Sequence, residues 1–165
     1  MASLGKMLAA KVTGLMTAPA GVNGHVAALA AAEAIALPPF DPRHIGEQNV
    51  AAELAERAAG AQYPALQVYC EKLTNSLREK FQTFSGTAEM AVEVRVTQDR
   101  LEGIEPKLQL YVDAVTQVLD HSRGDWGDGM FYGGGYQASF GPVKHGGRNF
   151  LQTAKVSFEV EISRS

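Results

Sequence analysis

A strict alternation of apolar and polar residues near the C-terminus most constrains what this chain can fold into. From Thr153 to Ile162 every second residue is apolar, and lysine, serine and glutamate fill the positions between. Because successive side chains of a β-strand point to opposite faces, this pattern predicts a long strand with one buried face. Almost no residues with catalytic chemistry accompany it, which favours a scaffold that presents surfaces.

Two further runs predict strands. The run from Thr87 to Thr97 alternates in the same way, and a shorter run covers Ala65–Cys70. The residues expected to face inward are Ala88, Met90, Val92, Val94 and Val96 in the first run and Leu66, Val68 and Cys70 in the second. The outward residues of the first run include Glu89, Glu93 and Arg95. Such one-sided strands belong to antiparallel or mixed sheets.

The strongest helical pattern lies between Ile104 and His121, where apolar residues recur at spacings of three and four, as in a helix lying on a sheet. A third strand is predicted over Tyr136–Val143, and the turn at Lys144–Asn149 leads into the fourth. The predicted fold is therefore α/β of the α+β kind. It has a mostly antiparallel or mixed four-stranded sheet, order β-β-α-β-β, packed by helices.

Two intervening segments allow more than one interpretation. The charged segment Lys72–Phe84 fits a helical stripe or the packed side of a long loop, and helix is the favoured interpretation. The segment Asp125–Gly135 holds five glycines among large apolar residues, which predicts a long hairpin arm or a mobile loop. Deleting Asp125–Gly135 is expected to leave the fold largely intact and to prevent assembly.

The first 62 residues are predicted to form an alanine-rich helical N-terminal extension to a domain spanning residues 63–165. Helices are expected over residues 3–16, Val26–Leu37 and Ile45–Ala59, with Ser3 as the first N-cap and Gly14 and Pro19 ending the first helix. Alanine favours helix but buries little area per residue. The extension is therefore expected to need a neighbour.

Composition limits the classes of partner. A formal net charge of −3 in 165 residues gives no general attraction to nucleic acid or to an anionic membrane. No run of eighteen apolar residues and no signal-peptide pattern is present, so the chain is expected to remain in the cytoplasm of the cell that makes it. Its single cysteine, Cys70, is expected to act as a small core hydrophobe rather than as a nucleophile.

Tests for a reaction centre yield no converging set of residues. The glycines from Gly124 to Gly129 follow a helix and precede a strand, which is the wrong order for a phosphate-binding helix N-terminus. Asp125 and Asp128 are expected to form turns rather than a cation site. The four histidines, His25, His44, His121 and His145, are scattered without a ligand spacing. We therefore expect no enzyme activity, cofactor or metal.

Charged strand residues and one turn leave open a role in binding. The outward charges, including Lys155, Glu159 and Glu161, fit cross-strand ion pairs better than a binding face unless the chain assembles into a ring. The turn from His145 to Phe150 contains two glycines and Arg148. It is either a tight hairpin or an interface.

Four segments together resemble one family of proteins. They are Val94-Arg-Val-Thr-Gln-Asp, Leu110-Tyr-Val-Asp-Ala, Gly124-Asp-Trp-Gly-Asp-Gly-Met-Phe-Tyr and Phe140-Gly-Pro-Val-Lys-His-Gly-Gly-Arg-Asn-Phe-Leu-Gln. In order and content, they resemble the tail terminator proteins of tailed bacteriophages. The resemblance covers roughly residues 63 to 163 and leaves out the alanine-rich first 60.

The resemblance implies a virion structural protein of the tail or neck, assembled in the host cytoplasm. Its subunits would form a ring, expected to be a hexamer, at the head-proximal end of the tail tube. That ring would bind the tail tube protein, stop tube polymerisation and join a neck, head-completion or connector protein. Genomic DNA would pass through its channel without sequence-specific binding.

Aromatic residues concentrate binding energy at interfaces, and a heterologous ring needs contact surfaces on opposite flanks of a subunit. The predicted interface residues are Trp126, Met130, Phe131, Tyr132, Arg148 and Phe150. Three alternatives remain open: another neck component, such as a head-tail completion or stopper protein; a small soluble enzyme; and an adaptor whose fourth strand offers an open sheet edge to a peptide.

Overall fold

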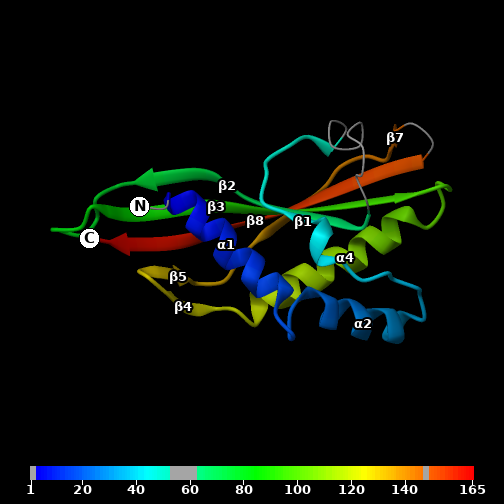
Figure 1. Cartoon of the computed structure of the whole chain (residues 1–165), viewed down its shortest axis with the longest axis horizontal. Coiled ribbons are helices and arrows are strands. Elements are labelled where there is room, and N and C mark those ends of the chain that lie inside the picture. Colours follow the sequence, from blue (N-terminus) through cyan, green and yellow to red (C-terminus); the bar gives the residue numbers. More distant parts are fainter. Residues whose placement is uncertain (1–2, 53–62, 147–148) are drawn as a thin grey trace.

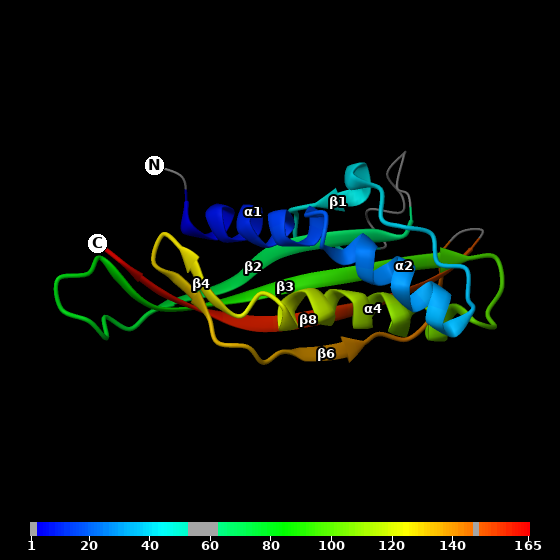
Figure 2. The same cartoon turned by 90° about the horizontal axis from the view of Figure 1, so that it is seen from below.

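The computed structural model describes residues 3–52, 63–146 and 149–165. One long, twisted sheet forms the body of the molecule, and α1 (Leu4–Thr17), α2 (Val22–Glu33) and α4 (Ile104–Asp120) cover one of its faces (Figures 1 and 2). The α+β class predicted from the sequence is confirmed. Among the described residues the sheet has eight strands. Six follow the path β1-β2-β3-β8-β5-β4, and β6 and β7 also pair with β8, so the strand count and order differ from the prediction.

The two alternating runs form the centre of the sheet. Strand β3 (Phe84–Gln98) pairs antiparallel with β8 (Asn149–Arg164) along its whole length, from Phe84 opposite Arg164 to Gln98 opposite Phe150. Strand β2 (Ala65–Asn75) pairs with the other edge of β3. These three strands correspond to the three predicted from alternation, and each is longer than predicted.

Three short strands share the other edge of β8. They are β5 (Met130–Tyr132), β6 (Gln137–Phe140) and β7 (Lys144–Gly146), which pair in turn with successive parts of β8. The third strand expected over Tyr136–Val143 is confined to β6, since residues 141–143 are not in a strand, and residues 144–146, expected to belong to the following turn, form β7. Strand β4 (Gly124–Gly127) pairs with β5 and ends the sheet path on this side.

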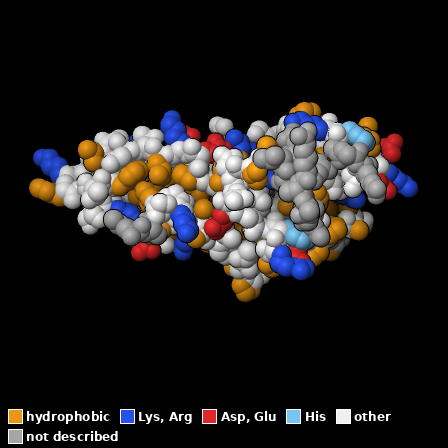
Figure 3. Space-filling model, turned by 45° about the horizontal axis from the view of Figure 1, so that its top comes forward, with side chains coloured by type: hydrophobic (Ala, Val, Ile, Leu, Met, Phe, Trp, Pro, Cys, Tyr) orange, Lys and Arg blue, Asp and Glu red, His pale blue; other side chains and the backbone are white. Residues whose placement is uncertain are grey.

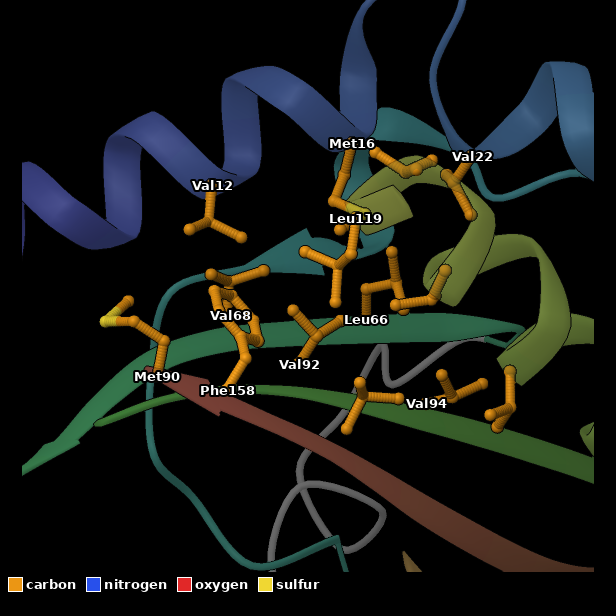
Figure 4. Close-up of a cluster of buried hydrophobic side chains, with 14 of the residues drawn as sticks. Val12, Met16, Val22, Leu66, Val68, Met90, Val92, Val94, Leu119 and Phe158 are labelled. Atoms are coloured by element: carbon orange, nitrogen blue, oxygen red, sulfur yellow. The ribbon is translucent and has the colours of Figure 1, made fainter. Parts of the chain in front are cut away.

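The core lies between the helices and the sheet (Figure 4). The inward residues predicted for β3 are all buried, and those of β8 lie beside them in one apolar cluster. Helix α4 contributes Leu108, Val115 and Leu119, whose spacing places them on one side of the helix. One-sided periodicity in the sequence therefore located the core correctly.

The N-terminal helices belong to the same cluster. Helix α1 begins at its predicted N-cap, where the Ser3 hydroxyl accepts a hydrogen bond from the Lys6 amide at 3.3 Å. It continues through Gly14, which was expected to end it, and contributes Leu8 and Val12 to the core. Helix α2 begins before the predicted residue and packs against α4, which is the neighbour that its small side chains require.

Three sequence-based predictions are corrected by the structure. The helix expected over Ile45–Ala59 does not begin at Ile45: a 3₁₀ turn (η1, Pro42–His44) leads into a two-residue strand (β1, Ile45–Gly46) that pairs parallel with Leu66 and Gln67, and residues 47–51 have no regular structure. Ala52 is helical, and residues 53–59 of that prediction lie outside the described residues. The helix expected over Lys72–Phe84 is instead the end of β2 and a connecting loop. Arg95, expected to be exposed, is 2% exposed.

Candidate interaction surfaces

The hairpin of β4 and β5 was expected to reach a partner, but most of it packs into the core. Trp126, Met130 and Tyr132 are buried, with Tyr132 fully enclosed. The Tyr132 ring lies 5.4 Å, centroid to centroid, from both the Trp126 and the Phe158 rings. Three of the predicted interface side chains are therefore directed into this subunit rather than outward.

Hydrogen bonds complete that packing. Trp126 donates from Nε1 to the Ser122 carbonyl at 2.7 Å, and the Tyr132 hydroxyl donates to the Gly135 carbonyl at 2.9 Å. Burial raises the pKa of Tyr132 to about 12, with the nearby Asp120 carboxylate acting in the same direction. A buried aromatic residue with its polar atom satisfied is a stabilising core element.

The structure describes two of the three other predicted interface residues, and both keep exposed surface. Phe131 is 45% exposed and is available for contact, and Phe150 is partly buried with its ring 5.2 Å from that of His145. Arg148 lies outside the described residues. Gly146 pairs with Asn149, which fits the tight hairpin considered for this turn. An interface role for Phe131 and Phe150 stays a prediction.

The sheet face opposite the helices carries a polar network. The Tyr69 hydroxyl donates to Glu93 Oε2 at 3.1 Å, and Arg95 Nε donates to Glu93 Oε1 at 3.1 Å. Arg95 also donates from Nη2 to the Val50 carbonyl. Burial and the Glu93 carboxylate hold the pKa of Tyr69 well above its usual range. We call the sheet face opposite the helices the open face. The residues of this network stabilise the fold at one end of the open face, because each charged group among them is paired.

Beside that network the open face forms a hollow of about 550 Å³. Its lining combines strand residues with the glycine turn that precedes β6, namely Glu71, Glu89, residues 134–137, Ser157, Phe158 and Glu159. Glu71 forms an ion pair with Lys155 at 2.8 Å, as expected for cross-strand charges. Glu89, however, lies directly opposite Glu159 in the β3–β8 register, and like charges placed so are unfavourable.

The loop joining β2 to β3 carries the most exposed apolar side chains. Figures 1 and 2 show this hairpin extending past the ends of α1 and the β4–β5 hairpin. We call residues 72–83 the arm. Leu73, Leu77 and Phe81 are 44%, 62% and 99% exposed. In Figure 3 apolar and basic side chains lie together at that end of the molecule.

Sequence reasoning missed the arm because it assigned the segment to a helix. Two local signals pointed the other way. Strand-forming residues continue past Cys70 through a register shift in β2, and Asn75-Ser76 is a turn-forming pair. A bulge hides strand periodicity, since it moves every later side chain to the opposite face.

The candidate catalytic and metal-binding groups behave as structural groups. Desolvation raises the pKa of Cys70, which disfavours the thiolate. The Asp125 carboxylate accepts a hydrogen bond from the Gly127 amide at 2.8 Å, as expected of a turn former. His25 and His121, distant in sequence, stack at 5.4 Å. Residues 3–52, 63–146 and 149–165 contain no group of three or more potential metal-ligating side chains.

None of the helices in the described part of the chain combines the length and the apolar character needed to span a bilayer.

A scan against protein-family models and a search of curated protein sequences found nothing that matches this chain.

Proposed function

We propose that this chain is a ring-forming structural subunit of the tail terminator kind. In this proposal it caps the head-proximal end of a phage tail tube. Support comes from the four sequence segments that resemble that family and from the distribution of its surfaces. The observation that carries most weight is the arm, whose Phe81 side chain is 99% exposed. Leu73 and Leu77 in the same short segment are also exposed, and several exposed large apolar side chains in one segment indicate an interaction surface more strongly than a single one does.

A ring also needs two different contact surfaces on each subunit. The arm lies at one end of the sheet, whereas the hollow lies on the face that no described helix covers. Two dissimilar surfaces at separate places generate head-to-tail contacts, which close into a ring if the rotation between subunits allows it. The ring would contact the tail tube protein on one side and a neck or connector protein on the other, leaving a channel for DNA.

The proposal assigns no reaction to the chain. Stopping a polymer requires only that the terminal ring bind the last tube ring and present a different surface outward. Assembly and termination would then depend on interface geometry, without a cofactor.

The test is assembly on tubes. The purified full chain is mixed with tail tubes from the same source and imaged by electron microscopy, and its mass is followed by light scattering. Rings at one end of each tube, together with tubes that no longer elongate, are the expected result. Rings that bind a portal or connector but ignore tubes would favour another neck component. A chain that neither assembles nor binds tubes would contradict the proposal.

A strand-adding adaptor is the second candidate, and one observation favours it. All four residues of β6 are exposed, and β6 pairs only with β8 among the described strands. Strand β6 therefore offers a free edge, whereas β8, the strand expected to serve, is paired on both sides. Binding of an extended peptide along β6, detected as protection of its backbone amides from hydrogen exchange, would support this alternative.

A further inference from the structure

The arm exposes large apolar side chains on an ordered scaffold. Leu77 and Phe81 are the two most exposed large apolar residues in the described chain. Both have positive φ angles, 49° and 67°, which bulky residues rarely adopt. Residues held in such sparsely populated backbone conformations cost about 1–3 kcal/mol each, and they cluster at functional sites such as ligand clamps and switch regions.

Hydrogen bonds fix the arm in that shape. The Asn75 carboxamide donates to the Thr83 carbonyl at 3.0 Å and accepts from the Ser85 amide at 3.0 Å. Glu79, at the tip, accepts a hydrogen bond from the Ser163 hydroxyl of β8 at 2.6 Å. The arm is thus organised before any partner arrives, which lowers the entropy lost on binding.

The tip also carries cations without intramolecular partners. Arg78 and Lys80 flank Glu79, and neither forms an ion pair with another described residue. Since Glu79 is engaged by Ser163, the tip presents two positive charges beside two apolar side chains. A complementary surface would be anionic and partly apolar.

The hollow on the open sheet face has that character. Glu89 and Glu159 line it, opposite each other and without an ion-pair partner among the described residues, and Tyr136, which is 39% exposed, adds an aromatic surface. Its volume of about 550 Å³ falls within the range of about 300–1,000 Å³ typical of pockets that enclose organic groups. A cationic occupant would relieve the repulsion between the two glutamates.

The arm residues that carry the proposal lie away from the hollow of their own subunit. Lys72, at the base of the arm, is directly opposite Glu89 in the β2–β3 register, but the amides of Arg78 and Glu79 donate to Ser85, four residues along β3 from Glu89. At about 3.4 Å per residue this is about 14 Å of paired strand. Occupation of the hollow by Leu77, Arg78, Lys80 and Phe81 together therefore requires a second copy of the chain.

We propose that the arm of one subunit docks into the hollow of a second copy of this chain, with Phe81 and Leu77 as apolar anchors and Arg78 and Lys80 facing Glu89 and Glu159. The contact is head-to-tail, because each subunit has one arm and one hollow at different places. This inference rests on the proposed ring, for which it names the subunit interface.

The experiment uses two full-length variants that each lose one half of the contact. The arm variant is Arg78→Ser/Lys80→Ser/Phe81→Ser, and the hollow variant is Glu89→Lys/Glu159→Lys. Analytical ultracentrifugation of the wild-type chain is expected to show assembly, and each variant alone is expected to associate at least about tenfold more weakly. An equimolar mixture is expected to form a dimer of twice the 17.6 kDa of one chain, since one intact arm then meets one intact hollow.

Control variants separate this contact from general effects of charge and apolar surface. Asp99→Lys/Glu102→Lys makes the same change in charge at exposed positions of the turn between β3 and α4, and Leu101→Ser removes a side chain that is 56% exposed in the same turn. Both controls are expected to assemble like the wild type. Folding of every variant is checked by circular dichroism and thermal unfolding.

The outcomes distinguish the inference from the proposed function. Assembly of the arm and hollow variants at wild-type strength, a mixture that forms no dimer, or a wild-type chain that stays monomeric up to millimolar concentration would overturn the inference. Rings of the arm variant on tail tubes would also overturn it while leaving the proposed function intact. Arm-dependent assembly without tube binding would support the inference and contradict the proposed function.

Discussion

The β4–β5 hairpin and the arm between β2 and β3 each have the opposite role to the one that their sequences indicate. The β4–β5 hairpin is rich in glycine and aromatic residues, the composition expected of a mobile contact loop, yet its Trp126, Met130 and Tyr132 side chains lie in the core. The arm between β2 and β3 is charged and reads as a helix, yet it exposes Phe81 almost completely. Composition alone does not determine whether an aromatic residue serves folding or binding.

The difference comes from what each hairpin pairs with. Met130 lies opposite Ile162 on β8, so the β4–β5 hairpin is joined to the central sheet and its side chains continue the core. The arm extends beyond the helices that would cover it (Figure 2). Burial is thus decided by long-range register, and the predictions below separate the two hairpins on that basis.

The largest expected difference is in stability. Tyr132→Ala removes a fully buried ring from the β4–β5 hairpin and is expected to lower the free energy of unfolding by about 3–5 kcal/mol. Phe81→Ala in the arm is expected to change it by less than about 0.5 kcal/mol. Urea unfolding of the two variants measures both values. Equal losses would mean that the arm packs on the body in solution.

The same burial corrects the expectation that residues 125–135 are dispensable for folding. Their deletion would remove Trp126, Met130 and Tyr132 from the core together with the pairing of β5 and β8. A loss of assembly after that deletion would therefore report unfolding rather than a missing contact.

The next prediction concerns the turn of the β4–β5 hairpin, which lies close to β8. Gly129 has φ +77°, and a Cβ atom there would lie 2.0 Å from the Ser163 carbonyl oxygen. Gly129→Ala is therefore expected to destabilise the fold by about 1–3 kcal/mol, from backbone strain and displacement of β8. Gly127→Ala is the matched control, since its φ is +81° but no atom lies within 4 Å of the added Cβ. Thermal unfolding should rank Gly129→Ala below Gly127→Ala.

Alkaline pH offers a smaller and reversible test of Tyr132 burial. The folded pKa of Tyr132 is about 12, whereas an unfolded tyrosine ionises near 10. The unfolded state therefore loses its proton first, and stability falls between pH 10 and 12 by at most about 1.4 kcal/mol per pH unit for this group. Tyr132→Phe is expected to flatten that slope, whereas Tyr136→Phe, at a side chain 39% exposed, is expected to leave it unchanged.

The sequence predicted those parts of the structure that a single element can specify. The strands at Thr87–Thr97 and Thr153–Ile162 and the helix from Ile104 were predicted because each buries one face, and a buried face imposes a periodicity. The α+β class followed from their order.

The features that were missed depend on contacts between distant segments. Arg95 has the position of an outward residue on β3, but the Val50 carbonyl, 45 residues earlier in the chain, accepts its hydrogen bond. Ile45 joins the sheet only because it meets Leu66. The hollow forms where residues 134–137 approach Glu71, Glu89 and Glu159, a meeting of three separate segments. None of these contacts leaves a local pattern.

The last prediction shortens the arm, and its main readout is self-association rather than stability. Replacing residues 76–83 by an Asn-Gly turn would keep a hairpin between β2 and β3 while removing Leu77 and Phe81. The bond from Ser163 to Glu79 would be lost together with the bonds of Ser76, Arg78 and Glu79 to Ser85, which is 3% exposed, so the free energy of unfolding is expected to fall by about 1–3 kcal/mol. Ultracentrifugation of the same variant is expected to show complete loss of self-association. Full assembly of a stable, arm-less chain would return the interface to Phe131 and Phe150, because these are the described members of the predicted set that retain exposed surface.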